Sequence, residues 1–165
     1  MKKIIFVRHG RAEDRTSEIT DFERSLTTKG KAVSRMMAVM FRKTENDPGV
    51  FITSPAFRAL ETAFIFAPEF NIMPEDIRIE SDLYERINLK ILLGILKTVD
   101  GNINSVTLFG HNPAFTEMAD RLCAKGCEFM TKTSIAGISF QTNEWSEIKP
   151  SEGHIEYFLK PDKSE

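Results

Sequence analysis

Apolar residues along this chain fall into short continuous runs and longer helical stripes. The first run, Lys3 to Val7, is mostly apolar, which is typical of a strand buried on both faces. A polar, charge-rich stretch from Gly10 to Ser25 follows it. From about Thr28 to Lys43, apolar residues recur at helical spacing, which predicts one buried helix face. That face comprises Val33, Met36, Met37, Met40 and Phe41. Its methionines are interpreted as core filler.

The middle of the chain repeats this alternation of strand and helix patterns. Val50 to Thr53 predicts a second strand, after which Ser54-Pro55 begins a helix as N-cap and first helical residue. The residues that we expect this helix to bury are Phe57, Leu60, Phe64 and Ala67. A short strand is predicted around Ile77 to Glu80. Asn88 then caps a helix with a 3.6-residue apolar stripe. The stripe is formed by Leu89, Leu92, Leu93 and Leu96.

The last third predicts a strand at Ser105 to Phe109 and a helix that begins at Pro113. The buried residues expected on this helix are Phe115, Met118, Ala119 and Leu122. Two antiparallel strands follow, near Ile135 to Gln141 and Ile155 to Leu159. Strands that alternate with helices imply a mostly parallel sheet covered on both faces. We therefore expect an α/β fold of three layers, α/β/α, with C-terminal antiparallel strands, in a single domain spanning residues 1–165.

Composition and charge narrow the classes of partner. The formal net charge of the 165 residues is −2, which provides no electrostatic footprint for nucleic acid. The apolar run ending at Val7 is too short for the core of a secretory signal and meets Arg8 at once. No stretch approaches the length of a membrane span. We expect a cytoplasmic protein that binds neither nucleic acid nor membrane.

Three of the predicted strands are followed by residues with distinctive chemistry. These segments are Arg8-His9-Gly10, Ser54-Pro55 with Arg58 in the next helical turn, and Gly110-His111-Asn112-Pro113. Ligands of open α/β sheets gather beyond the carboxyl ends of the strands. Helix side chains lean toward the helix N-terminus, so that Arg58 reaches back to this edge. We therefore expect Arg8, His9, Arg58 and His111 to converge.

Two guanidiniums and two imidazoles form an anion site, and tetrahedral phosphate is its natural ligand. Arginine forks bind phosphate oxygens in pairs, and the helix that starts at Pro55 adds its positive end. Nearby cations lower the pKa of a histidine, which keeps His9 neutral and nucleophilic near pH 7. The non-catalytic interpretation is that the histidines are hydrogen-bonded loop residues and that the arginines pair with acidic residues on the surface. It is weakened because two of the three histidines occupy the same kind of strand end; His154 is interpreted as structural or solvated.

A metal site is the alternative chemistry for these residues. His9, His111 and Glu85 would supply two imidazoles and one carboxylate, a set that catalytic zinc uses. The sequence contains no short-spaced ligand pair such as HExxH, and two adjacent arginines would repel a dication. We expect no metal and no cofactor.

At these three segments the sequence resembles the histidine phosphatase superfamily, which groups phosphoglycerate mutases with acid phosphatases. The superfamily's RHG signature is present as Arg8-His9-Gly10, and its late histidine block as Gly110-His111-Asn112-Pro113. The second block, Ser-Pro-x-x-Arg-Ala-x-x-Thr-Ala, is present as Ser54, Pro55, Arg58, Ala59, Thr62 and Ala63. Three blocks in order, each at its predicted structural position, make the resemblance specific and imply a phosphoglycerate mutase-like fold.

Within the superfamily the chain most resembles the short bacterial phosphohistidine phosphatase branch. The residues that follow the branch's loop-to-helix pattern are Asp21, Arg24, Leu26, Thr27 and Gly30. Ser25 departs from it, since proline is common there, whereas Thr133-Ser134-Ile135-Ala136 resembles the branch's C-terminal strand entry. About 48 residues separate Thr62 from His111, leaving little room for the helical cap of larger mutases. The resemblance therefore implies an exposed pocket, suited to a phosphorylated side chain on another protein.

The resemblance implies a covalent mechanism. His9 would attack phosphorus in line and carry the phosphoryl group, which water then hydrolyses. Arg8, Arg58 and His111 would hold the non-bridging oxygens and stabilise the transition state. The residues that we expect to bind substrate are Arg8, Arg58, Gly10, Arg11 and Arg24.

The proton donor and the loop from Arg11 to Arg24 stay open at this point. Many superfamily members use a carboxylate between the second and third blocks, and Glu85 is the candidate, with Glu80 and Asp82 as competitors. The labile P–N bond of phosphohistidine can also make a strong general acid unnecessary. The loop is either a recognition segment or merely solvated, and Arg24 could anchor it through Asp21.

These expectations combine into a predicted function. The protein is predicted to be a phosphohistidine phosphatase that acts on a phosphorelay or other phosphorylated protein through a covalent phospho-His9 intermediate. A small-molecule phosphomonoesterase of the same superfamily is the nearest alternative. A non-catalytic phospho-binding module is the alternative from another class, and a mutase is disfavoured because the cap is missing.

Overall fold

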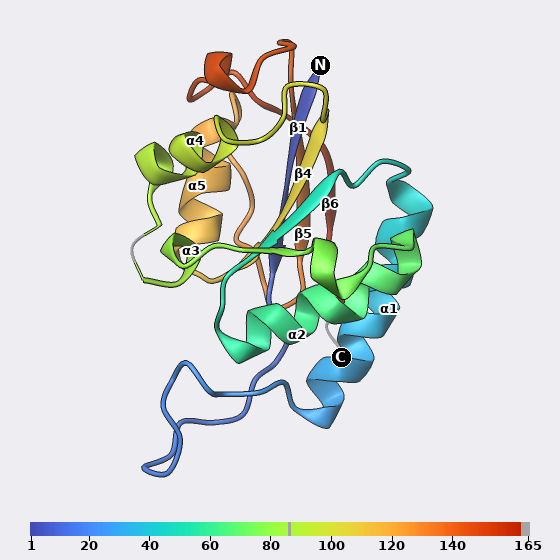
Figure 1. Cartoon of the computed structure of the whole chain (residues 1–165), viewed down its shortest axis with the longest axis vertical. Helices are drawn as coiled ribbons and strands as arrows, with labels where there is room; N and C mark the ends of the chain where they lie inside the picture. The colour runs from blue at the N-terminus through green and yellow to red at the C-terminus, as the bar shows by residue number, and fades with distance from the viewer. Residues whose placement is uncertain (86, 163–165) are drawn as a thin grey trace.

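The computed structural model describes residues 1–85 and 87–162, which contain a six-stranded sheet in the order β3-β2-β4-β1-β5-β6 (Figure 1). The strands are β1 Lys2–Arg8, β2 Val50–Thr53, β3 Arg78–Ile79, β4 Ser105–Gly110, β5 Ile135–Phe140 and β6 His154–Leu159. Parallel pairing joins β1 to β4, β4 to β2 and β2 to β3. Strand β5 pairs antiparallel with both β1 and β6. The predicted strands and the mixed sheet are confirmed.

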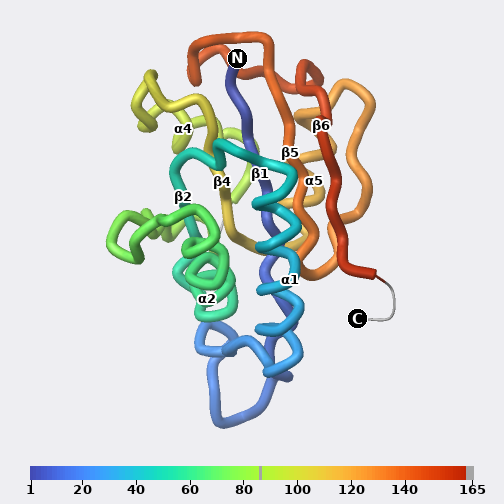
Figure 2. Tube along the Cα trace, turned by 90° about the vertical axis from the view of Figure 1, so that its right-hand side faces the viewer, coloured from blue at the N-terminus to red at the C-terminus, as the bar shows by residue number. Residues whose placement is uncertain are grey.

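Helices cover both faces of this sheet (Figures 1 and 2). α1 Thr28–Thr44 and α2 Phe57–Phe66 lie on one face, and α4 Leu89–Leu96 and α5 Ala114–Leu122 on the other. The shorter helical segments are α3 Asp82–Glu85, η1 Ala67–Phe70, η2 Pro74–Asp76 and η3 Trp145–Glu147. The predicted three-layer α/β/α fold is confirmed. None of the helices in the described residues has the length and apolar character needed to cross a membrane.

The central strand β1 is anchored by burial on both faces. Ile4 and Phe6 pack into the core beneath α4 and α5, while Ile5 and Val7 pack beneath α1 and α2. All four side chains are completely buried, and burial of each contributes about 1.5–3 kcal/mol. The end of β1 is therefore a rigid support for the two residues that follow Val7, namely Arg8 and His9.

The carboxyl ends of β1, β4 and β2 meet at one edge of the sheet. In the parallel register Arg8 lies opposite Gly110, and Thr53 lies opposite Phe109. The pairing continues past the strands, because the amide of His9 donates to the carbonyl of Gly110 at 3.0 Å. The amide of Ser54 likewise donates to the carbonyl of Phe109 at 2.9 Å. Segments distant in the sequence are thus brought together at this edge, as parallel strands require.

The predicted start of α2 is wrong, and its predicted buried face is confirmed only in part: Ala67 is buried and Leu60 is half-buried. The helix begins at Phe57 with Ala56 as N-cap, so Ser54 and Pro55 precede it. Phe57 and Phe64 are more than 40% exposed. The residues that face inward are Arg58, Ala59, Thr62, Ala63 and Phe66. Arg58 was predicted to reach back to the sheet edge, and it lies on the inner face, where it binds Asp21 of the loop after β1. Thr62 was not predicted to face inward, and it does so because its hydroxyl accepts the amide of Gly10.

The predicted apolar face of α1 is confirmed in part. Met37 and Phe41 are fully buried, and Val33 and Met36 are half-buried against the same core. Met40 is 39% exposed, so the interpretation of this methionine as core filler is wrong.

Candidate active site

His9 lies directly beyond the end of β1 and is only 8% exposed. Its Nδ1 is 2.7 Å from the carbonyl oxygen of Gly10. Because a carbonyl can only accept a hydrogen bond, Nδ1 carries the ring proton when the imidazole is neutral. The lone pair of the neutral ring is then on Nε2, which is the nitrogen available for nucleophilic attack.

The surroundings of His9 favour this neutral form. Burial lowers the pKa of His9 well below the ordinary histidine value, and His111, Arg58 and Arg8 lower it further. The hydrogen bond to Gly10 acts in the opposite direction. The sequence predicted the effect of the arginines, but burial is the largest cause. At pH 7 the ring is therefore uncharged and able to act as a nucleophile.

His111 follows β4 and lies beside His9, with 5.1 Å between the ring centroids. Its Nε2 is 2.7 Å from the hydroxyl oxygen of Ser54. Burial, followed by the charge of Arg58, lowers the pKa of His111 to about 3. Ser54 is thus a partner of the second histidine, a role that its predicted place as a helix N-cap concealed.

Arg58, in the first turn of α2, is 6% exposed and held by the loop that follows β1. Its two terminal nitrogens donate to Asp21, one to the backbone carbonyl at 2.6 Å and the other to carboxylate Oδ2 at 3.0 Å. The helix is also tied to the strand end through Thr62. The hydroxyl of Thr62 donates to the carbonyl of Arg58 at 2.7 Å and accepts the amide of Gly10 at 3.1 Å.

Arg8 ends β1 and is half-buried on the α5 side of the site. One terminal nitrogen donates to the carbonyl of Met130 at 2.9 Å. The Nε of Arg8 is buried with no hydrogen-bond partner in the part of the chain that the structure describes. The guanidinium also lies 5.9 Å from the ring centre of Phe129. The charges of Arg8 and Arg58 both act on His9 and His111, whose rings lie side by side. The four residues are thus brought together as expected, and their catalytic roles stay a prediction.

Asp21 is the residue of this region that sequence reasoning underestimated. Its carboxylate accepts from Arg58, from Arg24 at 2.9 Å and from the hydroxyl of Tyr84 at 3.0 Å. Burial alone would raise the pKa of Asp21, but the hydrogen bonds from Arg24 and Arg58 lower it. The predicted pairing of Arg24 with Asp21 is present. The only sequence signal was that spacing of three residues, which says nothing about Arg58 or Tyr84.

The other predicted substrate-binding residues have structural contacts of their own. Gly10 donates its amide to Thr62, and Arg24 donates its Nε to the carbonyl of Glu13 at 2.7 Å. Arg11 has an exposed side chain, and its carbonyl accepts the amide of Thr27 at 2.9 Å. Contact of Gly10, Arg11 and Arg24 with substrate stays a prediction.

The carboxylates proposed as proton donors lie around α3. Glu85 ends this short helix and is exposed, next to Tyr84, whose ring is 5.6 Å from that of His111. Glu80 accepts from Arg78 at 2.8 Å, and Asp82 is exposed. The described part of the chain brings together no group of three His, Cys, Asp or Glu residues that could hold a metal ion.

The sequence of this chain was compared with known protein families and with individual proteins. The family model described as histidine phosphatase superfamily (branch 1) matches residues 4–91. An uncharacterized protein of Picosynechococcus sp. is 30% identical over 122 residues, which is 73% of this chain and 72% of that protein.

Solved structures share the fold. The protein histidine phosphatase SixA complexed with tungstate superposes with a TM-score of 0.81 at 21% identity, covering 99% of each chain. A mycobacterial glucosyl-3-phosphoglycerate phosphatase superposes with a TM-score of 0.65 at 12% identity, covering 94% of this chain and 97% of that one. At these identities the likeness concerns the fold.

Proposed function

Because this chain belongs to the histidine phosphatase superfamily, we propose that it is a metal-independent phosphatase whose nucleophile is His9 and whose substrate is phosphohistidine on a protein. The main support for the proposal is the protonation state of the His9 ring. The carbonyl of Gly10 holds the proton on Nδ1, and burial beside two arginines keeps the ring neutral, so that Nε2 presents a lone pair. A phosphorelay protein in the cytoplasm is the proposed physiological substrate.

In the first step, Nε2 of His9 attacks phosphorus in line with the bond to the leaving nitrogen. The Nε2–P bond forms as the substrate P–N bond breaks. The electron pair of the broken bond stays on the substrate ring, which leaves as neutral imidazole because its other nitrogen carries a proton. The phosphorylated ring of His9 becomes cationic, and its proton stays on Nδ1, which donates a hydrogen bond to the carbonyl of Gly10. Arg8, Arg58 and His111 stabilise the charge on the non-bridging oxygens.

In the second step, water attacks the phosphoryl group on the side opposite Nε2. The Nε2–P bond breaks and its electron pair returns to His9, while a proton of the water passes to the solvent or to the departing phosphate. Inorganic phosphate leaves, and the neutral His9 is restored. The tungstate in the SixA structure supports this scheme, since an oxyanion binds to a protein of the same fold.

The acids around the site favour a phosphohistidine substrate over an alkyl phosphate. An alkoxide leaving group needs a protonated acid beside it, whereas an imidazole leaves readily. Asp21 is held as a carboxylate by Arg24 and Arg58, and Glu80 is paired with Arg78. Glu85 is exposed at the end of α3 and makes no hydrogen bond or ion pair with the residues described, so that no contact orients it as an acid toward a leaving group. A leaving group that depends little on acid assistance therefore suits this site best.

Trapping of the phosphorylated enzyme tests the nucleophile. Rapid mixing with a phosphohistidine protein, followed by quenching in alkali, is expected to leave phosphate on His9 that is stable in base and labile in acid. EDTA should not change the rate. His9→Ala should abolish both trapping and turnover, while the matched control His154→Ala, at an exposed histidine in β6, should preserve both. Full turnover by the His9 variant would falsify the mechanism.

The same preparation separates the alternatives. Values of kcat/KM for sugar phosphates that exceed those for a phosphohistidine peptide would identify a small-molecule phosphomonoesterase instead. Tight phosphate binding without any trapped intermediate or turnover would identify a binding module. We expect preference for the phosphohistidine peptide and turnover through the trapped species.

A further inference from the structure

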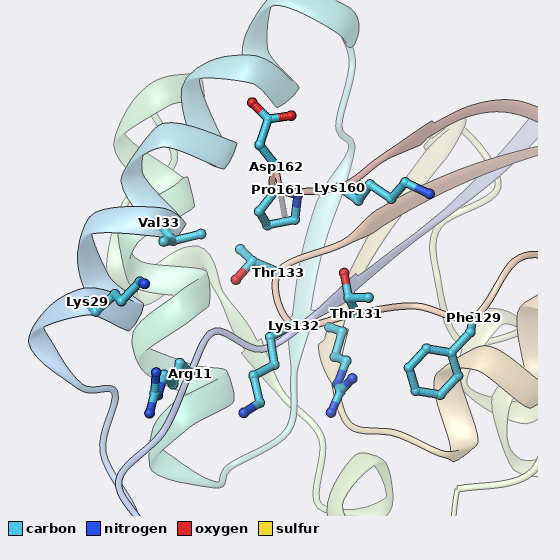
Figure 3. A pocket seen from close by; sticks show the side chains of 11 residues that line it. Arg11, Lys29, Val33, Phe129, Thr131, Lys132, Thr133, Lys160, Pro161 and Asp162 are labelled. Carbon is cyan, nitrogen blue, oxygen red and sulfur yellow. The ribbon is translucent and has the colours of Figure 1, made fainter. Parts of the chain in front are cut away.

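A cavity of about 500 Å³ adjoins the candidate active site and shares Arg8 with it (Figure 3). Four parts of the chain form its walls: the loop after β1, the first turns of α1, the segment that precedes β5 and the residues that follow β6. The segment before β5 is joined directly to the nucleophile strand. The amide of Thr133 is 3.1 Å from the carbonyl of Arg8 and 3.2 Å from that of His9. The mechanism proposed above makes no use of this cavity.

Basic side chains dominate the charged lining of the cavity. Arg11, Lys29 and Lys132, here named the basic cluster, come from three different wall segments and are all exposed. None of the three forms an ion pair with a residue in the described ranges. Figure 3 shows them around one end of the cavity, whereas Lys160 extends away from it. Lys160 is paired with Glu128 at 2.9 Å, so that its charge is already compensated.

Two further features indicate that a polar, anionic ligand occupies this space. Thr133 is 1% exposed, and its hydroxyl, in the cavity wall, has no hydrogen-bond partner among the described residues. Buried hydroxyls are nearly always paired, so this hydroxyl is suited to a hydrogen bond with a polar ligand in the cavity. The first turn of α1 also lies here, and it carries no acidic residue to offset the positive end of the helix.

The spread of the charges indicates what kind of anion fits. One phosphate group is bound by donors that converge on a single point. The basic cluster instead presents separate, exposed charges on long side chains, next to the apolar surfaces of Val33 and Phe129. Several carboxylates on an extended polypeptide match this arrangement, because each can meet one cation while the aliphatic parts contact the apolar wall.

We propose that the cavity binds an acidic segment of the phosphorylated protein while its phosphohistidine occupies the site at His9. This inference rests on the proposed function and names the substrate class, a phosphoprotein with Asp or Glu residues close to the phosphohistidine. Opposite charges on the two partners also accelerate association, and salt screens this effect.

A binding experiment tests the cavity without relying on turnover. The probe is a fluorescein-labelled, non-phosphorylated peptide rich in Glu, compared with a peptide in which every Glu is Gln. Fluorescence anisotropy should detect binding of the Glu peptide alone, and binding should weaken as the salt concentration rises. Lys29→Ala with Lys132→Ala should raise Kd by about tenfold or more, since two charge contacts are removed. The control pair, Lys43→Ala with Lys149→Ala, removes the same charge from exposed lysines elsewhere and should change Kd by less than about twofold.

Three results would overturn the inference. The first is an equal Kd for the Glu and Gln peptides, and the second is an equal rise in Kd in the control pair. The third is that inorganic pyrophosphate displaces the Glu peptide with a lower Kd than that of the peptide, and that this Kd depends on Lys29 and Lys132. The last result would assign the cavity to a small phosphorylated molecule.

Turnover separates failure of this inference from failure of the proposed function. Wild-type enzyme should show a lower KM for a phosphohistidine peptide with Glu flanks than for one with Gln flanks, at similar kcat. The Lys29 and Lys132 double variant should lose that preference and keep kcat. Equal KM for both peptides would overturn the inference and leave the phosphatase intact. Absence of turnover with either peptide would overturn the proposed function, and the anisotropy result would still decide whether the cavity binds acidic peptides.

Discussion

Among the residues that the structure describes, the ring of His9 has one hydrogen-bond partner, the carbonyl of Gly10, and this contact determines which nitrogen can react. An acceptor on Nδ1 holds the proton there and leaves the lone pair on Nε2. Burial then decides how far the neutral form persists into acid. Both effects come from the immediate surroundings of one side chain, and both have consequences that can be measured.

The pH dependence of activity follows from these surroundings. The lowered pKa values of His9 and His111 mean that neither ring gains a proton near pH 6.5 in the folded enzyme. After correction for ionisation of the substrate, we expect kcat/KM for p-nitrophenyl phosphate to show no loss between pH 8 and about pH 5, because the unperturbed histidine pKa of about 6.5 does not apply. Steady-state kinetics across this range provide the test. A fall with a midpoint near 6.5 would contradict the burial of His9.

Asp21 is expected to act as a positioning residue for Arg58. Asp21→Ala removes one of the two contacts that orient this buried guanidinium, and a hydrogen bond to a charged group contributes about 1.5–3 kcal/mol. We expect kcat/KM to fall by about tenfold or more, with an intermediate value for Asp21→Asn, which keeps an acceptor oxygen. The matched control is Asp14→Ala, at an exposed acid of the same loop. Equal kinetics for the Asp14 and Asp21 variants would remove the positioning role.

At the scale of elements, the site depends on how closely the end of β1 approaches α1. A Cβ atom at Gly10 would lie 2.6 Å from the hydroxyl of Ser34 and 3.2 Å from the carbonyl of Gly30. Glycine therefore lets the strand end pass against the helix. Beside α1, the late start of α2 leaves Ser54 outside the helix, where its hydroxyl lies 2.7 Å from Nε2 of His111.

The close packing of Gly10 against α1 can be tested by a pair of substitutions. Gly10→Ala should lower the free energy of unfolding by about 1–3 kcal/mol, because the added methyl group overpacks the contact with Ser34. Ser34→Ala should cost little, since its buried hydroxyl has no partner among the residues described. Urea denaturation of the double variant should recover much of the loss. Additive losses in the double variant would show that Ser34 is not the obstacle.

At the scale of the molecule, the stretch between the second and third sequence blocks completes the fold instead of forming a cap. It supplies β3 at the sheet edge and α4 on the face opposite α1 and α2. The expectation that little room remains for a cap agrees with this use of the chain. The structure also holds a buried His9 and a half-buried His111 in uncharged form, which links global stability to pH.

Stability is expected to fall on acidification. The pKa values of His9 and His111 are lowered in the folded state, so the unfolded chain binds more protons below pH 6.5. The stabilisation is complete above that pH and is lost as the pH falls toward 3. The slope is at most about 1.4 kcal/mol per pH unit for each histidine.

Urea unfolding between pH 7.5 and pH 5 measures this slope, in a range where most carboxylates stay ionised. His111→Asn should make the dependence shallower, whereas the control His154→Asn, at an exposed histidine, should leave it unchanged. An unchanged slope in the His111 variant would mean that this ring is not the group that titrates.

The amino-acid sequence was sufficient to predict the order and type of the strands and longer helices and the four residues that meet at the strand ends, whereas α3 and the 3-10 helices were not predicted. Apolar periodicity is a local property, and parallel pairing of β1, β4 and β2 necessarily places their carboxyl ends at one edge. Apolar periodicity could not predict the inward face of α2, because the polar residues Arg58 and Thr62 are buried there. Their burial depends on hydrogen bonds to Asp21 and Gly10, which are distant in the sequence.

The contacts that hold these residues in place became visible only in the folded structure. Asp21 and Arg58 are 37 residues apart, Ser54 and His111 are 57 apart, and Arg8 and Met130 are 122 apart. No local pattern encodes such pairs, since a hydrogen bond depends on where packing of the core places both groups. The same holds for the cavity beside Arg8, whose walls come from four separate segments. Local patterns select the elements, and burial of their apolar faces against one another determines which polar groups meet.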